Sequence, residues 1–316
     1  MATTDLGLYL LTVLIWGSTW IAIAQQLTVP AELSIAYRFL LAAAAMLGWC
    51  AVRGLPLRRP PREHAWIALQ AVLLFGLNYL LIYWATARLP SGVIALVFSS
   101  MMVMNLVNAA VLLRQPLERQ ALAAAALGLA GIGAVFAPEL AHLGAEAAQG
   151  LALSLAGTYA ASLGTIVSAR NQRAGIPLPV LNGYGMAYGA ALAFAAALAA
   201  GHRPVFDPAP AYVLSLLYLA LPGTVIAFWS YLTLLARIGP QRVGYVMVAF
   251  PVVALALSTA FEGYRWTPQA AAGVALVLAG NLLVLRRGRS VRAGAPDGAD
   301  GPASRAPPAP GRCPGS

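Results

Sequence analysis

Lysine is absent from this sequence of 316 residues, and charged residues of every kind make up only 9% of it. A soluble domain usually carries about 25% charged residues. The 20 basic residues are all arginine and outnumber the 10 acidic residues. Hydrophobic residues account for 60% of the chain. This composition excludes an ordinary soluble protein and favours one that lies within a membrane.

Cysteine and catalytic motifs are almost as scarce. Cys50 and Cys313 are the only cysteines, which is too few for a disulfide framework. The sequence contains no HExxH, no Cys/His ligand spacing, no Gly-Ser protease signature and no GxxxxGK(S/T) phosphate loop. We therefore expect no metal, no cofactor and no catalytic residue, and ATP hydrolysis would require a separate subunit.

Ten apolar runs approach the length of about 20 residues that crosses a bilayer as a helix. The fifth run is the shortest, with 17 residues. Because hydrocarbon offers no partner for exposed backbone groups, these runs must be helical. The sequence predicts an all-α membrane protein with ten transmembrane helices. The runs span residues 6–24, 33–52, 65–85, 92–113, 121–137, 151–168, 180–200, 211–236, 243–261 and 268–285.

An internal repeat indicates how these helices are organised. Residues 119–131 align without a gap to residues 268–280, with eight of thirteen positions identical at an offset of 149. Five spans separate equivalent positions, so the second half is predicted to be inverted, as in many secondary transporters. We expect a 5+5 inverted repeat: residues 1–143 form the first five-helix repeat and residues 144–286 the second. Residues 287–316, rich in Ala, Gly, Pro and Arg, are expected to form a disordered cytoplasmic tail.

The distribution of arginine predicts the orientation. With the N-terminus in the cytoplasm, 16 arginines fall in internal loops and the tail, and the external loops hold only Arg88, Arg203 and Arg265. Arginine is enriched on the cytoplasmic side of membrane proteins. Both termini are thus predicted to be cytoplasmic, in the inner membrane of a bacterium. The same rule accounts for the net charge of +10, so we expect contact with membrane lipids and no nucleic acid partner.

Two charged residues are candidates for function within or near the membrane. Arg38 is the one charge clearly inside a predicted span, and a guanidinium there can anchor a carboxylate of the solute. The alternative is structural, in which Arg38 snorkels outward, pairs with Glu32 or caps carbonyl groups. Glu262, at the outer end of the ninth span, is either a coupling residue for protons or a surface charge near Arg265.

Polar and aromatic side chains recur on single helical faces and are predicted to line a substrate cavity. Their structural alternative is that they join helices to one another, because hydroxyl and amide groups commonly do so in membranes. A possible homodimer is left open. The candidate cavity residues, besides Arg38, are Trp16, Trp20, Asn78, Tyr79, Tyr83, Phe98, Met101, Asn105, Thr158, Ser162 and Trp229.

Prolines and glycines suggest where the helices bend. Pro222 and Gly223 in the eighth span and Pro251 in the ninth are expected to kink or loosen these helices. The repeat offset places Leu73 opposite Pro222 and Met102 opposite Pro251, so the first half lacks these prolines. The second half is therefore predicted to be the more flexible gate, unless the kinks are only tolerated structurally.

Together these residues resemble an EamA-type permease of the drug/metabolite transporter superfamily, over almost all of residues 7–286. The matching pieces are IWGSTWIAIA at 15–24, Arg38-Phe39, NYLLIYWA at 78–85, LPSGVIALVFSSM at 89–101, Phe250-Pro251, Glu262, Gln269, Gly273 and Gly280. The resemblance implies a central cavity lined by the first, third, fourth, sixth, eighth and ninth helices. It also implies that the fifth and tenth helices pack at the back or in a dimer contact. The chain departs from the family pattern at Met102, where a proline is common, and at Leu113, the position equivalent to Glu262.

These observations predict a permease that moves a small solute by alternating access. The resemblance implies transport of small metabolites, often efflux of amino-acid-like compounds, and we expect export of a neutral or zwitterionic metabolite. Two other classes stay open: an integral-membrane enzyme acting on a lipid-linked substrate, and a membrane scaffold or sensor that transports nothing.

Overall fold

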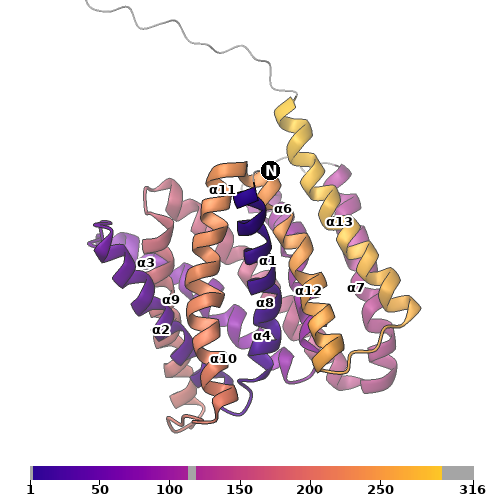
Figure 1. The fold of residues 1–316 in the computed structure, drawn as a ribbon, viewed down its shortest axis with the longest axis horizontal. Coiled ribbons are helices and arrows are strands. Elements are labelled where there is room, and N and C mark those ends of the chain that lie inside the picture. Colours follow the sequence, from indigo (N-terminus) through magenta and orange to yellow (C-terminus); the bar gives the residue numbers. More distant parts are fainter. Residues whose placement is uncertain (1–2, 113–118, 294–316) are drawn as a thin grey trace, which may run out of the picture.

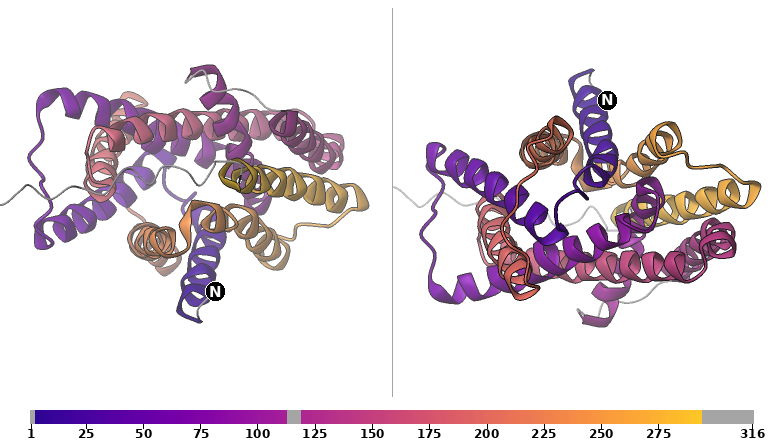
Figure 2. Two further views of the ribbon diagram at one scale, coloured as in Figure 1. Left: turned by 90° about the horizontal axis from the view of Figure 1, so that it is seen from above. Right: turned by 90° about the horizontal axis from the view of Figure 1, so that it is seen from below.

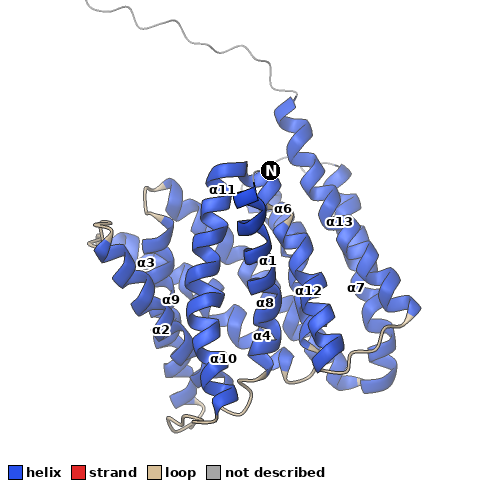
Figure 3. Cartoon of the chain, viewed as in Figure 1, coloured by secondary structure: helices blue, strands red, loops and turns tan. Residues whose placement is uncertain are grey.

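The computed structural model describes residues 3–112 and 119–293, and within these ranges the chain is largely helical, with no strand (Figure 3). Seven of the described helical segments are long and apolar enough to cross a membrane, and three shorter apolar helices accompany them. The helices are α1 (Thr3–Ala24), α2 (Ala31–Val52), α3 (Pro61–Gln70), η1 (Ala71–Leu77), α4 (Asn78–Thr86), α5 (Ser91–Ser99), α6 (Met101–Leu112), α7 (Arg119–Leu143), α8 (Ala145–Arg173), α9 (Leu178–Ala199), α10 (Pro210–Ala220), η2 (Leu221–Ile226), α11 (Ala227–Val243), α12 (Val246–Phe261) and α13 (Pro268–Ala293).

Proline and glycine mark many of the helix ends. Pro61 and Pro210 occupy the first turns of α3 and α10, where the missing amide hydrogen costs nothing and the fixed φ suits a helix. Gly54 follows α2 with φ +65°, and Gly201 follows α9 with φ +78°. Only glycine adopts this left-handed conformation readily, so the chain leaves each helix there.

The helices form an elongated layer that is more than one helix thick, with α1, α11 and α12 on one face and α8 behind them (Figures 1 and 2). The pair α2 and α9 lies at one end of the layer, the pair α7 and α13 lies at the other, and α1, α8, α11 and α12 lie between them. The start of α1 and the end of α13 lie at the same edge of the layer (Figure 1). We call this the proximal edge, and the opposite one the distal edge.

Helix boundaries repeat at the offset found in the sequence. Pro61 and Pro210 are 149 positions apart, as are the last residues of η1 and η2, Leu77 and Ile226. The segment α3–α4 descends from the proximal edge in Figure 1, and its counterpart α10–α11 ascends toward it. Contacts repeat as well: α2 packs on its counterpart α9, and α7 packs on its counterpart α13.

Glycines bring α7 and α13 into close contact. A Cβ atom added to Gly131 would come 2.6 Å from the carbonyl oxygen of Gly273, and one on Gly273 would come 2.5 Å from that of Gly131. A further contact joins Gly280 to the carbonyl oxygen of Ala124, at 2.8 Å from an added Cβ. Small residues permit such backbone approach, which favours helix association in lipid.

The helix α13 extends to Ala293, past residue 286, where the sequence placed the start of a disordered tail. Arginine is a good helix former and a favourable charge near a helix C-terminus, so loss of apolar periodicity did not end the helix. The remainder of the predicted tail, from residue 294, lies outside the described residues.

We predict that Gly131→Ala lowers the midpoint of thermal unfolding of the purified protein in detergent. The added methyl group overpacks the contact with Gly273, at a cost of about 1–3 kcal/mol. Gly133→Ala is the matched control, because nothing lies within 4 Å of a Cβ added there. Equal midpoints for the two variants would contradict this packing.

Candidate functional site

An aromatic cluster surrounds the middle of α1 and joins residues from both halves of the sequence. Trp20 is 8% exposed, and its ring lies 5.2 Å from Phe98 of α5 and 6.2 Å from Phe250 of α12. Trp16 lies 5.8 Å from Phe228 and 5.1 Å from Tyr231, both on α11. We call these six residues the aromatic wall. It provides flat apolar surface where the two halves meet.

By contrast, Trp229 on α11 is 52% exposed. Because α11 packs against α1, a side chain this exposed faces away from the helix contact. This favours a position of Trp229 toward lipid, and not the predicted position in the cavity. Trp229 is adjacent in sequence to Phe228 of the aromatic wall, but neighbouring residues on a helix point about 100° apart.

Arg38 lies on the second turn of α2 and is only 3% exposed. Its guanidinium carbon lies 5.0 Å from the ring centre of Tyr79 and 5.7 Å from that of Phe39. Such cation–π contacts stabilise a desolvated guanidinium by about 2 kcal/mol or more. Neither Nε nor Nη1 of Arg38 has a hydrogen-bond partner among the described residues.

Tyr83 links Arg38 to the end of α1. Its hydroxyl donates a hydrogen bond to Oε1 of Gln26 at 2.7 Å, and its oxygen accepts one from Arg38. Ser34 donates to the backbone carbonyl of Gln26 at 3.2 Å and shares a 3.0 Å hydrogen bond with the hydroxyl of Tyr212. Gln26 is fully buried, and its Nε2 has no hydrogen-bond partner within residues 3–112 and 119–293. These residues thus form a buried polar site near the distal edge.

A second polar network joins α6 to α8. Asn108 donates from Nδ2 to Oγ of Ser162 at 2.8 Å, and Ser162 donates to Oδ1 of Asn105 at 2.6 Å. Thr158, one turn earlier on α8, donates to the carbonyl oxygen of Ser154 at 2.7 Å. In this conformation these groups satisfy one another, which matches the structural alternative of joining helices.

The fourth predicted span is interrupted at Ser100, between α5 and α6. Ser99 and Ser100 donate hydrogen bonds from their hydroxyls to carbonyl oxygens three residues earlier, a pattern that bends helices. The predicted common face of Phe98, Met101 and Asn105 is therefore divided between two segments: Phe98 contacts α1, and Asn105 bonds to α8.

Two π-helical segments, η1 and η2, occupy equivalent positions of the repeat. Pro222 and Gly223 lie in η2, and a Cβ atom on Gly223 would come 2.9 Å from Cγ2 of Thr19 on α1. Directly after η1, Asn78 donates from Nδ2 to the carbonyl oxygen of Leu74 at 3.2 Å, while its buried Oδ1 has no hydrogen-bond partner among the residues described. π-Helical turns often occur at functional sites. Pro251 lies inside α12.

Glu262 closes a contact between α5 and α12 at the distal edge. Its Oε2 accepts hydrogen bonds from the amide nitrogen of Ser91 at 2.9 Å, from Oγ of Ser91 at 2.8 Å and from Oγ of Ser258 at 2.6 Å. A carboxylate at the N-terminus of α5 is also favoured by the helix dipole. We call Glu262, Ser91 and Ser258 the distal latch. Leu113, the predicted counterpart of Glu262, lies outside the described residues.

Further polar contacts join chain segments at both edges of the layer. At the proximal edge, Nε of Arg237 lies 2.7 Å from Oδ1 of the buried Asp5, which ties α11 to α1. At the distal edge, Thr28 donates a hydrogen bond to Asp207 at 2.7 Å. This bond, together with one from the amide of Ala209, lowers the pKa of the Asp207 carboxyl group.

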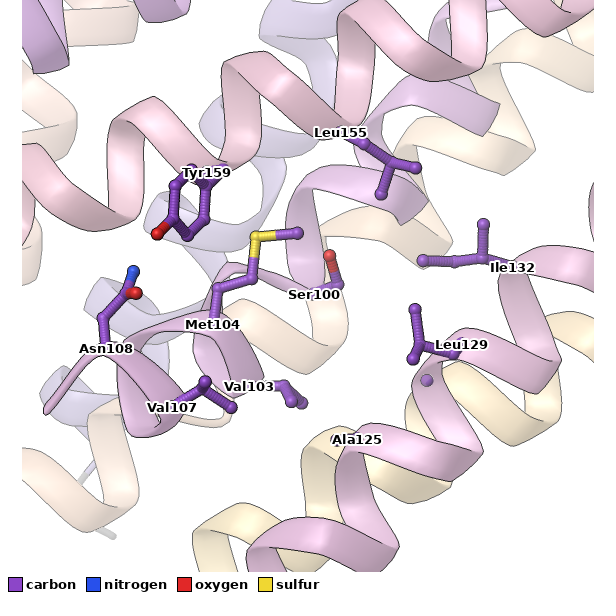
Figure 4. Close-up of a pocket in the computed structure, with 11 residues that line it drawn as sticks. Ser100, Val103, Met104, Val107, Asn108, Ala125, Leu129, Ile132, Leu155 and Tyr159 are labelled. Carbon is purple, nitrogen blue, oxygen red and sulfur yellow. The ribbon is translucent and has the colours of Figure 1, made fainter. Parts of the chain in front are cut away.

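A groove of about 170 Å³ lies between α6, α7 and α8 (Figure 4). Its lining includes Met104, Leu129, Ile132 and Tyr159, whose side chains converge on it in Figure 4. None of the predicted cavity residues lines this groove. It is therefore separate from both the aromatic wall and the buried site around Arg38.

Sequence reasoning missed several residues of these sites. Gln26, Ser91 and Ser258 lie at or near helix ends, where polar residues are ordinary. Ser230 accepts a 2.9 Å hydrogen bond from Thr12, which joins α11 to α1. Ser91 lies in the matching piece at 89–101, and this was the one signal in the sequence for any of them. Among the described residues, no cluster of His, Cys, Asp and Glu has the arrangement of a metal site.

Comparison with known proteins defines the class. Residues 5–137 and 148–286 each match the model of the EamA-like transporter family. The chain belongs to this family, and it is a membrane transporter built of two repeats.

Individual relatives agree with this assignment. Protein PecM of Dickeya dadantii (strain 3937) is 27% identical over 270 residues, covering 83% of this chain and 84% of its own length. The uncharacterized inner membrane transporter YedA of Escherichia coli (strain K12) is 29% identical over 262 residues, covering 79% and 80%. A crystal structure superposes with a TM-score of 0.65 at 20% identity, over 92% of this chain and 99% of that one, and shows the fold alone.

The distal latch yields a test by a double-mutant cycle. We predict that Glu262→Ala lowers the stability of the purified protein by about 1–3 kcal/mol, because the donors of Ser91 and Ser258 lose their acceptor. Adding Ser91→Ala to Glu262→Ala should then cost less than Ser91→Ala alone. Thermal unfolding in detergent measures both effects, with Glu146→Ala, at an exposed residue, as control. Additive effects would show that the latch does not act as a unit.

Proposed function

We propose that this protein is a permease that exports a small neutral or zwitterionic metabolite across the bacterial inner membrane by alternating access. Its two repeats are inverted relative to each other, with ten spans in a 5+5 arrangement and both termini in the cytoplasm. In this orientation the proximal edge is cytoplasmic. The membership of the EamA-like transporter family and the repeated helix contacts support this proposal.

The main support for this proposed function is the aromatic wall. Trp16 and Trp20 belong to the first repeat, while Phe228, Tyr231 and Phe250 belong to the second. Transporters with inverted repeats bind their substrate between the repeats near the midplane, and aromatic rings offer a large apolar contact area there. We infer that a solute binds against this wall when the repeats part.

Alternating access requires segments that change shape, and η1 and η2 suit this role. They occupy equivalent positions in the two repeats, and each packs against neighbouring helices of the layer. With Pro222 in η2, the second of these segments has fewer backbone hydrogen bonds to break. We propose that the repeats rock about these two segments, with η2 moving further. The remaining predicted cavity residues, Asn78, Tyr79, Tyr83, Met101, Asn105, Thr158 and Ser162, would face the solute in an open state.

Glu262 offers a route for coupling to protons. Three donors stabilise its carboxylate in the closed distal latch, and protonation would weaken this acceptor. We propose that a proton arriving from the outside opens the latch. The same contact thereby serves closure and coupling.

Transport by purified protein in proteoliposomes tests the permease. We predict saturable movement of at least one solute from a panel of amino acids and related metabolites. Trp16→Leu should raise KM by about three- to tenfold, which corresponds to the 0.5–1.5 kcal/mol of an aromatic contact. Trp49→Leu is the control, because Trp49 is exposed on α2 and should leave KM unchanged. If no solute moves, or if both variants behave alike, the proposed function fails.

The coupling role has its own test. Glu262→Gln should abolish the dependence of uphill transport on a proton gradient while solute exchange without a gradient continues. Comparing the two rates in the same vesicles measures this. A Glu262→Gln variant that still concentrates solute against its gradient when a proton gradient is imposed would exclude coupling through Glu262.

A further inference from the structure

The buried site around Arg38 contains more hydrogen-bond donors than acceptors. Nε and Nη1 of Arg38 and Nε2 of Gln26 are all buried, and none has a hydrogen-bond partner in the part of the chain that the structure describes. Oε1 of Gln26 already accepts a hydrogen bond from the hydroxyl of Tyr83 at 2.7 Å, and the oxygen of this hydroxyl hydrogen-bonds with Arg38. A ligand that fits these atoms must therefore supply acceptors.

The charge at this site is also uncompensated. Within the part of the chain that the structure describes, the ion pairs join Arg59 to Glu63, His202 to Glu32 and Arg237 to Asp5, and none includes Arg38. A buried charge without a partner costs several kcal/mol. The rings of Tyr79 and Phe39 offset part of this cost, but a ring face does not occupy the N–H groups in the guanidinium plane.

The surroundings hold these donors in place. Tyr83 is fully buried, and its hydrogen bond to Oε1 fixes the amide of Gln26, which leaves Nε2 free to donate elsewhere. Ser34 and Tyr212 anchor the backbone at Gln26. Such preorganisation reduces the entropy lost on binding.

We propose that Arg38 and Gln26 form the binding site for a carboxylate group of the transported solute. A guanidinium offers two edges that hold a carboxylate bidentately, Nε with Nη2 and Nη1 with Nη2, and each edge of Arg38 includes a nitrogen without a partner. Nε2 of Gln26 donates a further hydrogen bond. Tyr79, half-buried beside the guanidinium, contacts the adjoining part of the solute. The site rests on the proposed function in one respect: it is enclosed in this conformation, and the solute enters it when the repeats part.

This site narrows the substrate class. A neutral amine or an alcohol cannot supply the paired, charged acceptors that the guanidinium edge requires, so it would leave the charge of Arg38 unpaired. We infer that the solutes handled by this protein carry a carboxylate, which within the proposed class makes them zwitterions. Amides and esters of the same solutes would bind much more weakly.

The experiment measures binding of benzoate and of its neutral isostere benzamide to the purified full-length protein in detergent, at constant ionic strength. Binding to the folded state raises the thermal midpoint by mass action. We expect benzoate to raise it and benzamide to leave it unchanged. Arg38→Gln should weaken benzoate binding by about tenfold or more, the range for loss of a charge-assisted bidentate contact.

Two further variants keep the proposal testable if Arg38→Gln does not fold. In Gln26→Glu, the protein itself supplies a carboxylate to the buried site around Arg38. This carboxylate should pair with Arg38, so the variant should be at least as stable as the unaltered protein and should no longer respond to benzoate. Arg53→Gln is the matched control, because Arg53 also lies over a ring, that of Trp49 at 5.7 Å, but is exposed. It should respond to benzoate as the unaltered protein does.

The outcomes separate this proposal from the proposed function. Equal binding of benzoate and benzamide, or an unchanged response in Gln26→Glu, would overturn the carboxylate site even if transport is found. Benzoate binding that depends on Arg38, in a protein that transports nothing, would uphold the site and reject the permease.

Discussion

The structure depends on one constraint: inside a bilayer, every polar group must find its partner within the protein. The backbone meets this constraint by folding into helices across most of the described residues. Most interior side chains meet it too, as Asn105, Asn108 and Ser162 do by bonding to one another. The exceptions are therefore informative. Among the described residues, Arg38, Gln26, Gln70, Asn78 and Ser154 retain buried side-chain groups without hydrogen-bond partners, and a bound solute is one way to satisfy such groups.

The repeat explains how a chain with so little charge organises its interior. Each half contributes one helix to the pair α2 and α9 and one to the pair α7 and α13, so both ends of the layer are built from both halves. The helices between them meet through aromatic rings at Trp16 and Trp20. The two halves differ, however, in the segments expected to be flexible. The segments η1 and η2 are equivalent in position, but only η2 contains a proline.

Much of the fold follows from the sequence because hydropathy reports directly on the bilayer. The predicted runs 33–52 and 243–261 differ from α2 and α12 by at most three residues at either end. The run at 151–168 was too short, since α8 spans Ala145–Arg173. Hydropathy marks the part of a helix in hydrocarbon, whereas Ala, Gln and Arg continue the helix beyond it. The exact count of ten spans remains a prediction.

Local irregularities and most site contacts did not follow from the sequence. Pro222 and Gly223 indicated a disturbed helix at η2, but η1 has no proline, and it packs closely against α9. A Cβ atom on Gly189 of α9 would come 2.7 Å from Cβ of Phe75 in η1. The distal latch likewise joins Ser91 to Glu262, 171 positions away. Contacts between residues so far apart in the sequence arise only when the helices pack together. Local sequence patterns therefore do not predict them.

The central claim, that the two repeats face opposite sides of the membrane, is tested most directly by cysteine accessibility. Arg62 and Ala211 are exposed residues in the first turns of α3 and α10, 149 positions apart. In a chain with Cys50 and Cys313 replaced by alanine, each position would carry a single cysteine. A maleimide that does not cross membranes should label position 211 in intact cells and position 62 only after the membrane is opened. Labelling of both positions from the same side would contradict the inverted arrangement.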